Sequence, residues 1–164
     1  MSTLISTFNQ QLDISPVQLE AILTKSLVEF LNSPELRATL HSLNTNLLRE
    51  TLPTSGQVLA KELPPFYHWL KKELGIKRVP DSPDHTTKWV IAFVNNQESL
   101  MHLVELHRPV PRLALEASIP RLVGVFTGVE DEQVKQEWQK AVAALCLVLV
   151  VAARERERLN LAVS

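Results

Sequence analysis

Glycine is scarce in this chain, with four residues among 164. The glycine-rich motifs G-x-G-x-x-G, G-x-x-x-x-G-K-[ST] and G-x-S-x-G do not occur in the sequence. Nucleotide-binding loops and nucleophile elbows need such glycines, because the backbone there approaches a phosphate closely or turns sharply. The sequence therefore argues against Rossmann, P-loop and α/β-hydrolase enzymes.

Cysteine is almost missing as well, since Cys146 is the only one. A single cysteine forms neither an intrachain disulfide nor a multi-cysteine zinc or iron–sulfur site. Cys146 lies inside an apolar stretch, where a thiol behaves as a small hydrophobic group and not as a reactive thiolate. We therefore expect this cysteine to be structural.

The chain also lacks an excess of either charge, with 17 basic and 18 acidic residues. A protein that binds a phosphate backbone usually needs a positive excess, so nucleic acid is not an expected partner. The first residues show neither a basic region nor a continuous apolar stretch. No secretory signal is predicted, and the expected location is cytoplasmic.

The most prominent feature that is present is an uncharged apolar run over residues 141–153. As a helix this run would be about 20 Å long, shorter than the ~30 Å hydrocarbon core of a membrane, so no transmembrane segment is expected. A helix that is apolar all round must be covered on all sides. We predict that it is the central helix of a bundle, covered by the chain's own helices or by the second copy of a homodimer.

Local signals predict where the other helices begin and end. Ser15-Pro16-Val17-Gln18 has the spacing of a capping box, and Ser33-Pro34 marks a second start. Helices are predicted over about 15–31 and 33–52, and Thr127 to Glu130 has the spacing of a further capping box before the final helix. The prolines at positions 53, 64, 65 and 120 are expected to end or kink helices.

These signals together predict a mainly α protein, a single helical domain over residues 15–164 with six or seven helices around the apolar C-terminal helix. The first dozen residues lack charge and clear periodicity, so 1–14 are expected to form a flexible arm. A subdomain boundary is placed at 76–87, where prolines and charged residues mix. The alternative is an α+β fold with a small sheet from 89–94 and 122–126, which are rich in β-branched and aromatic residues.

Two groups of residues are candidates for partner binding. Four leucines alternate spacings of four and three, as at the a and d positions of a coiled coil: Leu36, Leu40, Leu43 and Leu47. Two heptads are too few for an independent coiled coil. These leucines are therefore expected either to pack inside the domain or to form a self-association seam. Tyr67 and Trp69 belong to residue types that are enriched at protein interfaces.

The charged stretch that follows the apolar run alternates in sign from Arg154 to Arg158. Pairs three residues apart, Arg154 with Glu157 and Glu155 with Arg158, would support an exposed helix end. We therefore expect a solvated end to the final helix.

A carrier of a small hydrophobic ligand or cofactor is an alternative function. Apolar residues of two aromatic segments and of the following helix could line a pocket: Phe66, Trp69, Trp89, Phe93 and Met101. The same residues at helical spacing also form an ordinary core face. The sequence does not identify a cofactor.

A metal-dependent enzyme is the second alternative. Glu98, His102 and Glu105 fall on one face of a helix predicted over about 87–107, and carboxylate with imidazole suits zinc, iron or manganese. Di-iron bundles, however, need Glu-x-x-His pairs on two helices. No Glu-x-x-His occurs in the sequence, so an ordinary polar helix face is the simpler explanation.

The leading hypothesis from the sequence is a non-catalytic protein-interaction or assembly module that self-associates. It rests on missing catalytic signatures and on the amount of apolar helical surface. The expected partner is another protein or a second copy of the chain.

Overall fold

The part of the chain that the structure describes is helical throughout. The computed structural model describes residues 3–77 and 99–163, and within these ranges it contains eight α-helices, one short 3₁₀ helix and no strand. The predicted mainly α bundle is confirmed, with more helices than the six or seven expected. The elements are α1 (Thr3–Leu12), α2 (Pro16–Leu23), α3 (Leu27–Leu31), α4 (Pro34–Ser42), α5 (Thr45–Glu73), α7 (Ser99–Leu106), α8 (Arg112–Gly124), η1 (Val125–Gly128) and α9 (Glu132–Val163).

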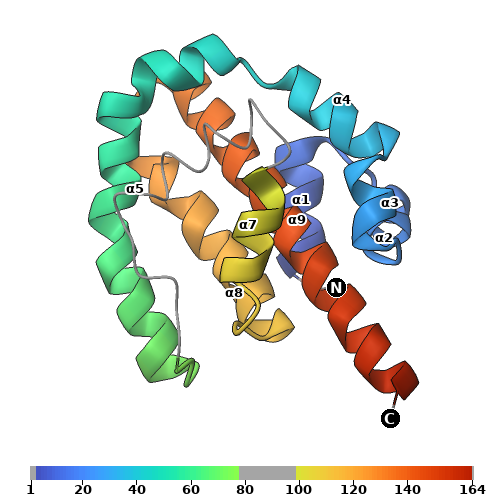
Figure 1. The fold of residues 1–164 in the computed structure, drawn as a ribbon. Helices are drawn as coiled ribbons and strands as arrows, with labels where there is room; N and C mark the ends of the chain where they lie inside the picture. Colours follow the sequence, from blue (N-terminus) through green and yellow to red (C-terminus); the bar gives the residue numbers. More distant parts are fainter. Residues whose placement is uncertain (1–2, 78–98, 164) are drawn as a thin grey trace.

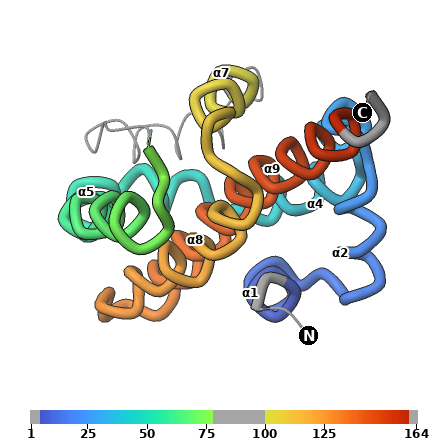
Figure 2. Tube along the Cα trace, turned by 90° about the horizontal axis from the view of Figure 1, so that it is seen from below, coloured from blue at the N-terminus to red at the C-terminus, as the bar shows by residue number. Residues whose placement is uncertain are grey.

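Helix α9 is the centre of the bundle and contacts every other described helix. In Figure 1 it passes between α5 and α8 on one side and α2 to α4 on the other, and Figure 2 places α1 and α7 on opposite sides of it. All residues of the run 141–153 are buried by the same chain, so the burial of α9 requires no second copy. By length and composition alone α9 could cross a membrane, but 83% of its most apolar window is buried inside the fold, which accounts for its apolarity.

The alternative with a small sheet is not supported. Residues 122–126 lie in the last turn of α8 and in η1, where the backbone is helical. Pro120 does not interrupt α8, which continues through it to Gly124. The other proposed strand, 89–94, lies outside the described residues, as does most of the expected boundary at 76–87.

The N-terminal residues form helix α1 where a flexible arm was expected. Phe8 is fully buried and Leu12 is almost so, and α1 contacts both α8 and α9. The helix carries no charged residue in its first or last turn. Its order comes from tertiary packing of a short apolar face, which the sequence pattern alone does not reveal.

The capping box at the start of α2 is confirmed. Ser15 Oγ accepts the N–H of Gln18 at 3.1 Å, and Gln18 Oε1 accepts the N–H of Ser15 at 3.0 Å. The single helix predicted over 15–31 is wrong, however, because the chain leaves the helix after Leu23. It restarts at α3, where Ser26 Oγ accepts the N–H of Glu29 at 3.2 Å.

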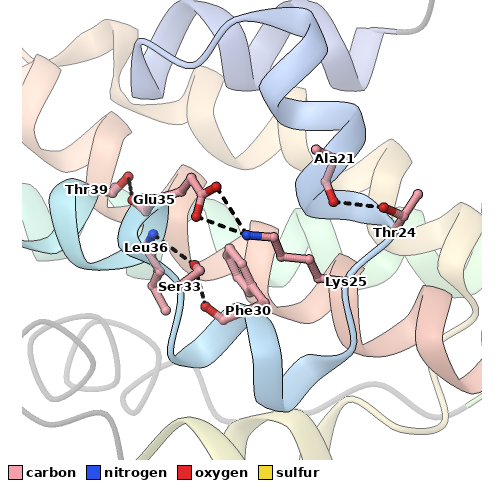
Figure 3. A network of polar contacts seen from close by, with 8 residues as sticks. All are labelled: Ala21, Thr24, Lys25, Phe30, Ser33, Glu35, Leu36 and Thr39. Carbon is pink, nitrogen blue, oxygen red and sulfur yellow. Dashed lines mark hydrogen bonds and ion pairs between the residues drawn. The ribbon is translucent and has the colours of Figure 1, made fainter.

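Ser33 joins α3 to α4 as the sequence predicts (Figure 3). Its Oγ donates to the carbonyl of Phe30 at 2.6 Å and accepts the N–H of Leu36 at 3.3 Å. Lys25 Nζ lies 3.1 Å from both carboxylate oxygens of Glu35. This ion pair fixes the start of α4 against the connection that precedes α3.

Helix α5 runs for 29 residues and continues through Pro53, Pro64 and Pro65. Each proline removes one hydrogen bond of the helix, and α5 is visibly bent in Figure 1. Of the two outcomes expected at these prolines, a helix end or a kink, the end does not occur, and the bend agrees with a kink. One buried stripe stays continuous across them and is formed by Leu48, Leu59, Leu63, Phe66 and Leu70.

The start of α9 also differs from the prediction, because the cap is Asp131. Its Oδ1 accepts the N–H of Gln133 at 3.0 Å and the N–H of Val134 at 3.2 Å. Thr127 instead lies in η1, and its Oγ1 donates to the carbonyl of Gly124 at 2.8 Å. The extended backbone of Val129 separates the two helices, so the predicted capping box does not form.

Two glutamates of α9 bind the N-terminal ends of other helices. Glu137 Oε2 accepts the N–H of Asn44, the residue before α5, at 2.9 Å. Glu155 Oε2 accepts the N–H of Leu27, the first residue of α3, at 3.0 Å. Because 18 residues make about five helical turns, both carboxylates lie on one face of α9.

The end of α9 is exposed from Glu157 to Asn160, as expected, but its charged side chains also bind neighbouring helices. Arg158 donates to the carbonyls of Thr24 and Lys25. Arg154 lies 3.0 Å from Glu116 of α8. Arg112 of α8 binds this same carboxylate at 3.1 Å and Glu157 at 2.7 Å. The ion pairs of the alternating stretch therefore run between helices, and the predicted pairing within the helix is wrong.

Candidate functional site

A small apolar cavity lies where α5, α8 and α9 meet, beside the connection from α7 to α8. Its volume of about 60 Å³ exceeds the roughly 10–15 Å³ that one water molecule needs. In Figure 1, α8 lies between α5 and the lower half of α9. The residues that line the cavity come from these three helices and from the connection that follows α7. The described lining residues are Phe66, Tyr67, Leu70, His107, Val110, Leu115, Ser118, Leu122, Cys146 and Leu149.

His107 is the lining residue with the most distinctive chemistry. Its Nδ1 lies 2.9 Å from the carbonyl oxygen of Leu103, and since a carbonyl only accepts, Nδ1 carries the proton. Burial lowers the pKa of His107; the hydrogen bond to Leu103 opposes this, and the charge of Arg156 adds to it. The ring is therefore neutral at pH 7, and Nε2 presents a lone pair.

Two further polar lining groups, Ser118 and Cys146, offer little reactive chemistry. Ser118 Oγ donates to the carbonyl of Ala114 at 2.6 Å and keeps only its capacity to accept. Burial raises the pKa of Cys146 to about 12 from an ordinary 9.0, so the thiol is protonated at neutral pH. The expectation of a structural cysteine agrees with this, because a buried thiol without a nearby cation is a poor nucleophile.

The structure brings together only part of the pocket predicted from the sequence. Phe66 lines the cavity, whereas Met101 is 47% exposed on α7. Trp69 packs elsewhere on α5, with its ring centroid 5.9 Å from that of Phe66 and the guanidinium of Arg121 4.6 Å above it. Trp89 and Phe93 lie outside the described residues.

The candidate partner-binding leucines do not share one helix. Leu43 has an extended backbone and ends α4, and Asn44 Oδ1 then caps α5 by accepting the N–H of Leu47 at 3.1 Å. Leu36 and Leu43 are buried in the core, while Leu40 and Leu47 are partly buried against it. The helix predicted over 33–52 is thus wrong, and no continuous a/d seam is formed. Of the aromatic candidates, Tyr67 lines the cavity.

The metal hypothesis finds no support among the residues that can be placed. His102 and Glu105 are exposed on α7, and Glu105 lies 3.4 Å from Arg108. Glu98 lies outside the described residues. Within residues 3–77 and 99–163, no three histidine, cysteine, aspartate or glutamate side chains are grouped so that they could hold a metal ion.

Sequence reasoning missed most of the cavity. The three residues of α8 that line it, Leu115, Ser118 and Leu122, have helical spacing, but the expected interruption at Pro120 concealed their common face. His107 and Cys146 are far apart in the sequence, and only the packing of α7 and α8 on α9 brings them to one cavity.

Comparison with known proteins adds no relative from which a role could be carried over. No protein-family model matches the chain, and neither the curated proteins nor the solved structures contain a match. The function therefore has to be inferred from the geometry of the chain itself.

Proposed function

We propose that this chain is a non-catalytic helical module that binds another protein and receives one small side chain of that partner in the cavity between α5, α8 and α9. The observation that carries the proposal is the size and lining of this cavity. Small-molecule sites usually measure about 300–1,000 Å³. A cavity of about 60 Å³ fits the end of one side chain better than a cofactor, which favours an interaction module over a carrier.

The surroundings of the cavity support a protein partner. Tyr67 at its wall is partly buried and belongs to a residue type that is enriched in binding hot spots. Lys71 on α5 is an exposed cation, Arg108 beside His107 is exposed and pairs with Glu105 at 3.4 Å, and no carboxylate is found among the described lining residues. Charge complementarity therefore favours a partner segment that carries acidic residues next to the inserted side chain.

The chemistry of the lining supports a non-catalytic role. Cys146 is a protonated thiol, and His107 uses Nδ1 for a bond to its own helix. Activation of a nucleophile would need a base within hydrogen-bond reach of it and a third group to orient that base. The described residues around the cavity form no such chain of contacts that involves Ser118, since its hydroxyl donates to a backbone carbonyl.

A displayed library of random peptides, selected against the full chain, tests the proposal. Leu122→Trp fills the cavity from α8, and Leu113→Trp is the matched control, because Leu113 is 68% exposed on the same helix and does not line the cavity. We expect peptides that bind the wild type and Leu113→Trp equally and bind Leu122→Trp at least about tenfold more weakly. Circular dichroism checks that both variants fold.

Two outcomes would overturn the proposal: no enriched peptide, or peptides that bind Leu122→Trp as well as the wild type. Sedimentation of the same three proteins addresses the self-association expected from the sequence. A dimer that Leu122→Trp abolishes and Leu113→Trp retains would identify the partner as a second copy of this chain.

A further inference from the structure

We propose that Arg156 of α9 and Arg108 of the connection between α7 and α8 together bind a phosphate group. Neither arginine is among the described residues that line the cavity between α5, α8 and α9, so this site is independent of the proposed function. It is indicated by the partners of the arginines at this end of the molecule, by the face of α9 on which Arg156 lies, and by the accessibility of both side chains.

The arginines around the end of α9 differ in what they bind. Arg154 lies 3.0 Å from Glu116, and Arg112 lies 3.1 Å from the same carboxylate. Arg158 donates to backbone carbonyls of the connection between α2 and α3. Arg156, by contrast, forms neither a hydrogen bond nor an ion pair with any residue that the structure describes. Its guanidinium group therefore keeps all five N–H donors for a ligand or for water.

Arg156 lies on the face of α9 that turns toward the connection between α7 and α8. Leu149, which lines the cavity beside this connection, is seven residues earlier in α9, and seven residues make close to two helical turns. The electrostatics agree with this placement. Partial burial lowers the pKa of Arg156, the charge of Arg108 lowers it further, and the charge of Glu105 opposes this. Two guanidinium groups from separate elements thus lie near each other where α7 packs on α9.

The carboxylate at this place does not neutralise both arginines. Of the described carboxylates, Glu105 is the one whose charge acts on Arg156, and it lies 3.4 Å from Arg108. Both side chains of this pair are more than half exposed, at 56% and 64%, so the pair is weak. One carboxylate against two guanidinium groups leaves a positive charge, and the two like charges repel each other. An anion bound by both arginines would replace this repulsion with attraction.

The two guanidinium groups favour a phosphate over a carboxylate. Each guanidinium donates two parallel N–H bonds in a planar fork. A carboxylate has two oxygens, which one fork already occupies, whereas a phosphate has further oxygens that accept from a second fork on another side. Arg156 is partly buried and Arg108 is exposed, so the phosphate would lie at the surface, with room for a molecule that carries it. The expected ligand is therefore a phosphate dianion, either free or as a monoester.

Titration of the ¹⁵N-labelled full chain with inorganic phosphate tests the site, with sodium chloride adjusted so that the ionic strength stays constant. We expect saturable shifts of the Nε–Hε resonances of Arg108 and Arg156. Arg156→Gln and Arg108→Gln should each weaken phosphate binding at least about tenfold, because each removes charge-assisted hydrogen bonds. Arg37→Gln is the matched control, since it removes an exposed arginine of α4, and it should bind phosphate like the wild type.

Arg156→Lys separates recognition by a planar fork from attraction by a positive charge. Lysine keeps the charge and loses the fork. We expect Arg156→Lys to bind phosphate more weakly than the wild type and more tightly than Arg156→Gln. If Arg156→Lys bound phosphate as tightly as the wild type, the geometry of two forks would be wrong. Circular dichroism checks that each variant folds.

Phenyl phosphate in place of inorganic phosphate distinguishes the two sources of the ligand. Binding of phenyl phosphate at least as tight as that of inorganic phosphate supports a monoester carried by a larger molecule, and binding of inorganic phosphate alone supports the free ion. No saturable shift with either probe would overturn the proposal. Equal phosphate binding by the wild type and both glutamine variants would overturn it as well.

Discussion

At the scale of single residues, the partly buried ring of His107 makes stability depend on pH. Its folded pKa is lowered by burial, so as the pH falls through the ordinary value of 6.5 the unfolded chain binds the proton first. The free energy of unfolding should therefore fall between about pH 7.5 and pH 5.5. The charged groups near the ring are Arg156, Arg108 and Glu105.

Urea denaturation at both pH values measures this effect. His107→Leu should lose less stability on acidification than the wild type does, whereas the control His68→Leu, which changes an exposed histidine of α5, should lose as much as the wild type. An equal loss in His107→Leu and the wild type would show that His107 is not the partly buried neutral group described above.

Another prediction at this scale concerns the indole of Trp138, which is fully buried. Its Nε1–H donates to Thr51 Oγ1 at 2.8 Å, and its ring is stacked on that of Phe126 with centroids 5.7 Å apart. Thr51→Val leaves this N–H unpaired, which should lower the free energy of unfolding by about 1–3 kcal/mol.

Thr54→Val is the matched control for Thr51→Val. Thr54 is exposed on the same helix, and its hydroxyl donates to the carbonyl of Thr51 at 3.1 Å. Urea denaturation should show a loss of less than about 0.5 kcal/mol for this surface change. If both variants lost the same amount of stability, the low helix propensity of the β-branched valine would explain the effect. The hydrogen bond of the buried indole would not explain it.

At the scale of elements, the packing of α1 determines whether the N-terminal residues belong to the core. Phe8 is fully buried against a bundle in which α1 contacts α8 and α9. Phe8→Ala should therefore cost about 3–5 kcal/mol of stability. Val17→Ala, at a position 80% exposed on α2, should change it by no more than about 0.5 kcal/mol. If Phe8→Ala left the free energy of unfolding unchanged in thermal and urea denaturation, the N-terminal residues would behave as the flexible arm expected from the sequence.

The contact between α9 and the start of α5 gives a second prediction for elements. Glu137 is only 9% exposed, and it accepts the N–H of Asn44 while pairing with Lys140 at 2.7 Å. Hydrogen bonds to charged groups contribute about 1.5–3 kcal/mol, so Glu137→Gln should lower the free energy of unfolding by up to that amount. Glu130→Gln, at an exposed position before α9, should be close to neutral in the same denaturation experiment. Equal effects would mean that net charge, and not this contact, controls stability.

The same scale shows what the sequence could predict. The caps at Ser15 and Ser33 were predictable because each serine bonds a backbone group three residues away. The continuity of α5 through Pro64 was not, because it depends on a buried stripe that packs against distant parts of the chain. For the cavity, Phe66 and Tyr67 were singled out from their residue types, but their meeting with His107 depends on how the helices pack.

At the scale of the whole molecule, α9 unites the described helices. Every one of them contacts α9, so α9 is the element that the described helices have in common. The two features from which self-association was expected need no second copy, because α9 is covered by its own chain and the four leucines do not share one helix. Self-association stays a prediction that the sedimentation experiment above addresses.

This central position predicts that the protein unfolds as one unit. Unfolding curves followed by circular dichroism at 222 nm and by tryptophan fluorescence should coincide, as in two-state domains of about this size. Val148→Ala, at a fully buried position of α9, should shift both curves together to lower denaturant concentration. Separate transitions would show that the N-terminal helices α1 to α4 form a unit of their own. Their contacts with α9, including those of Leu27 with Glu155 and of Lys25 with Arg158, would then be weaker than the geometry indicates.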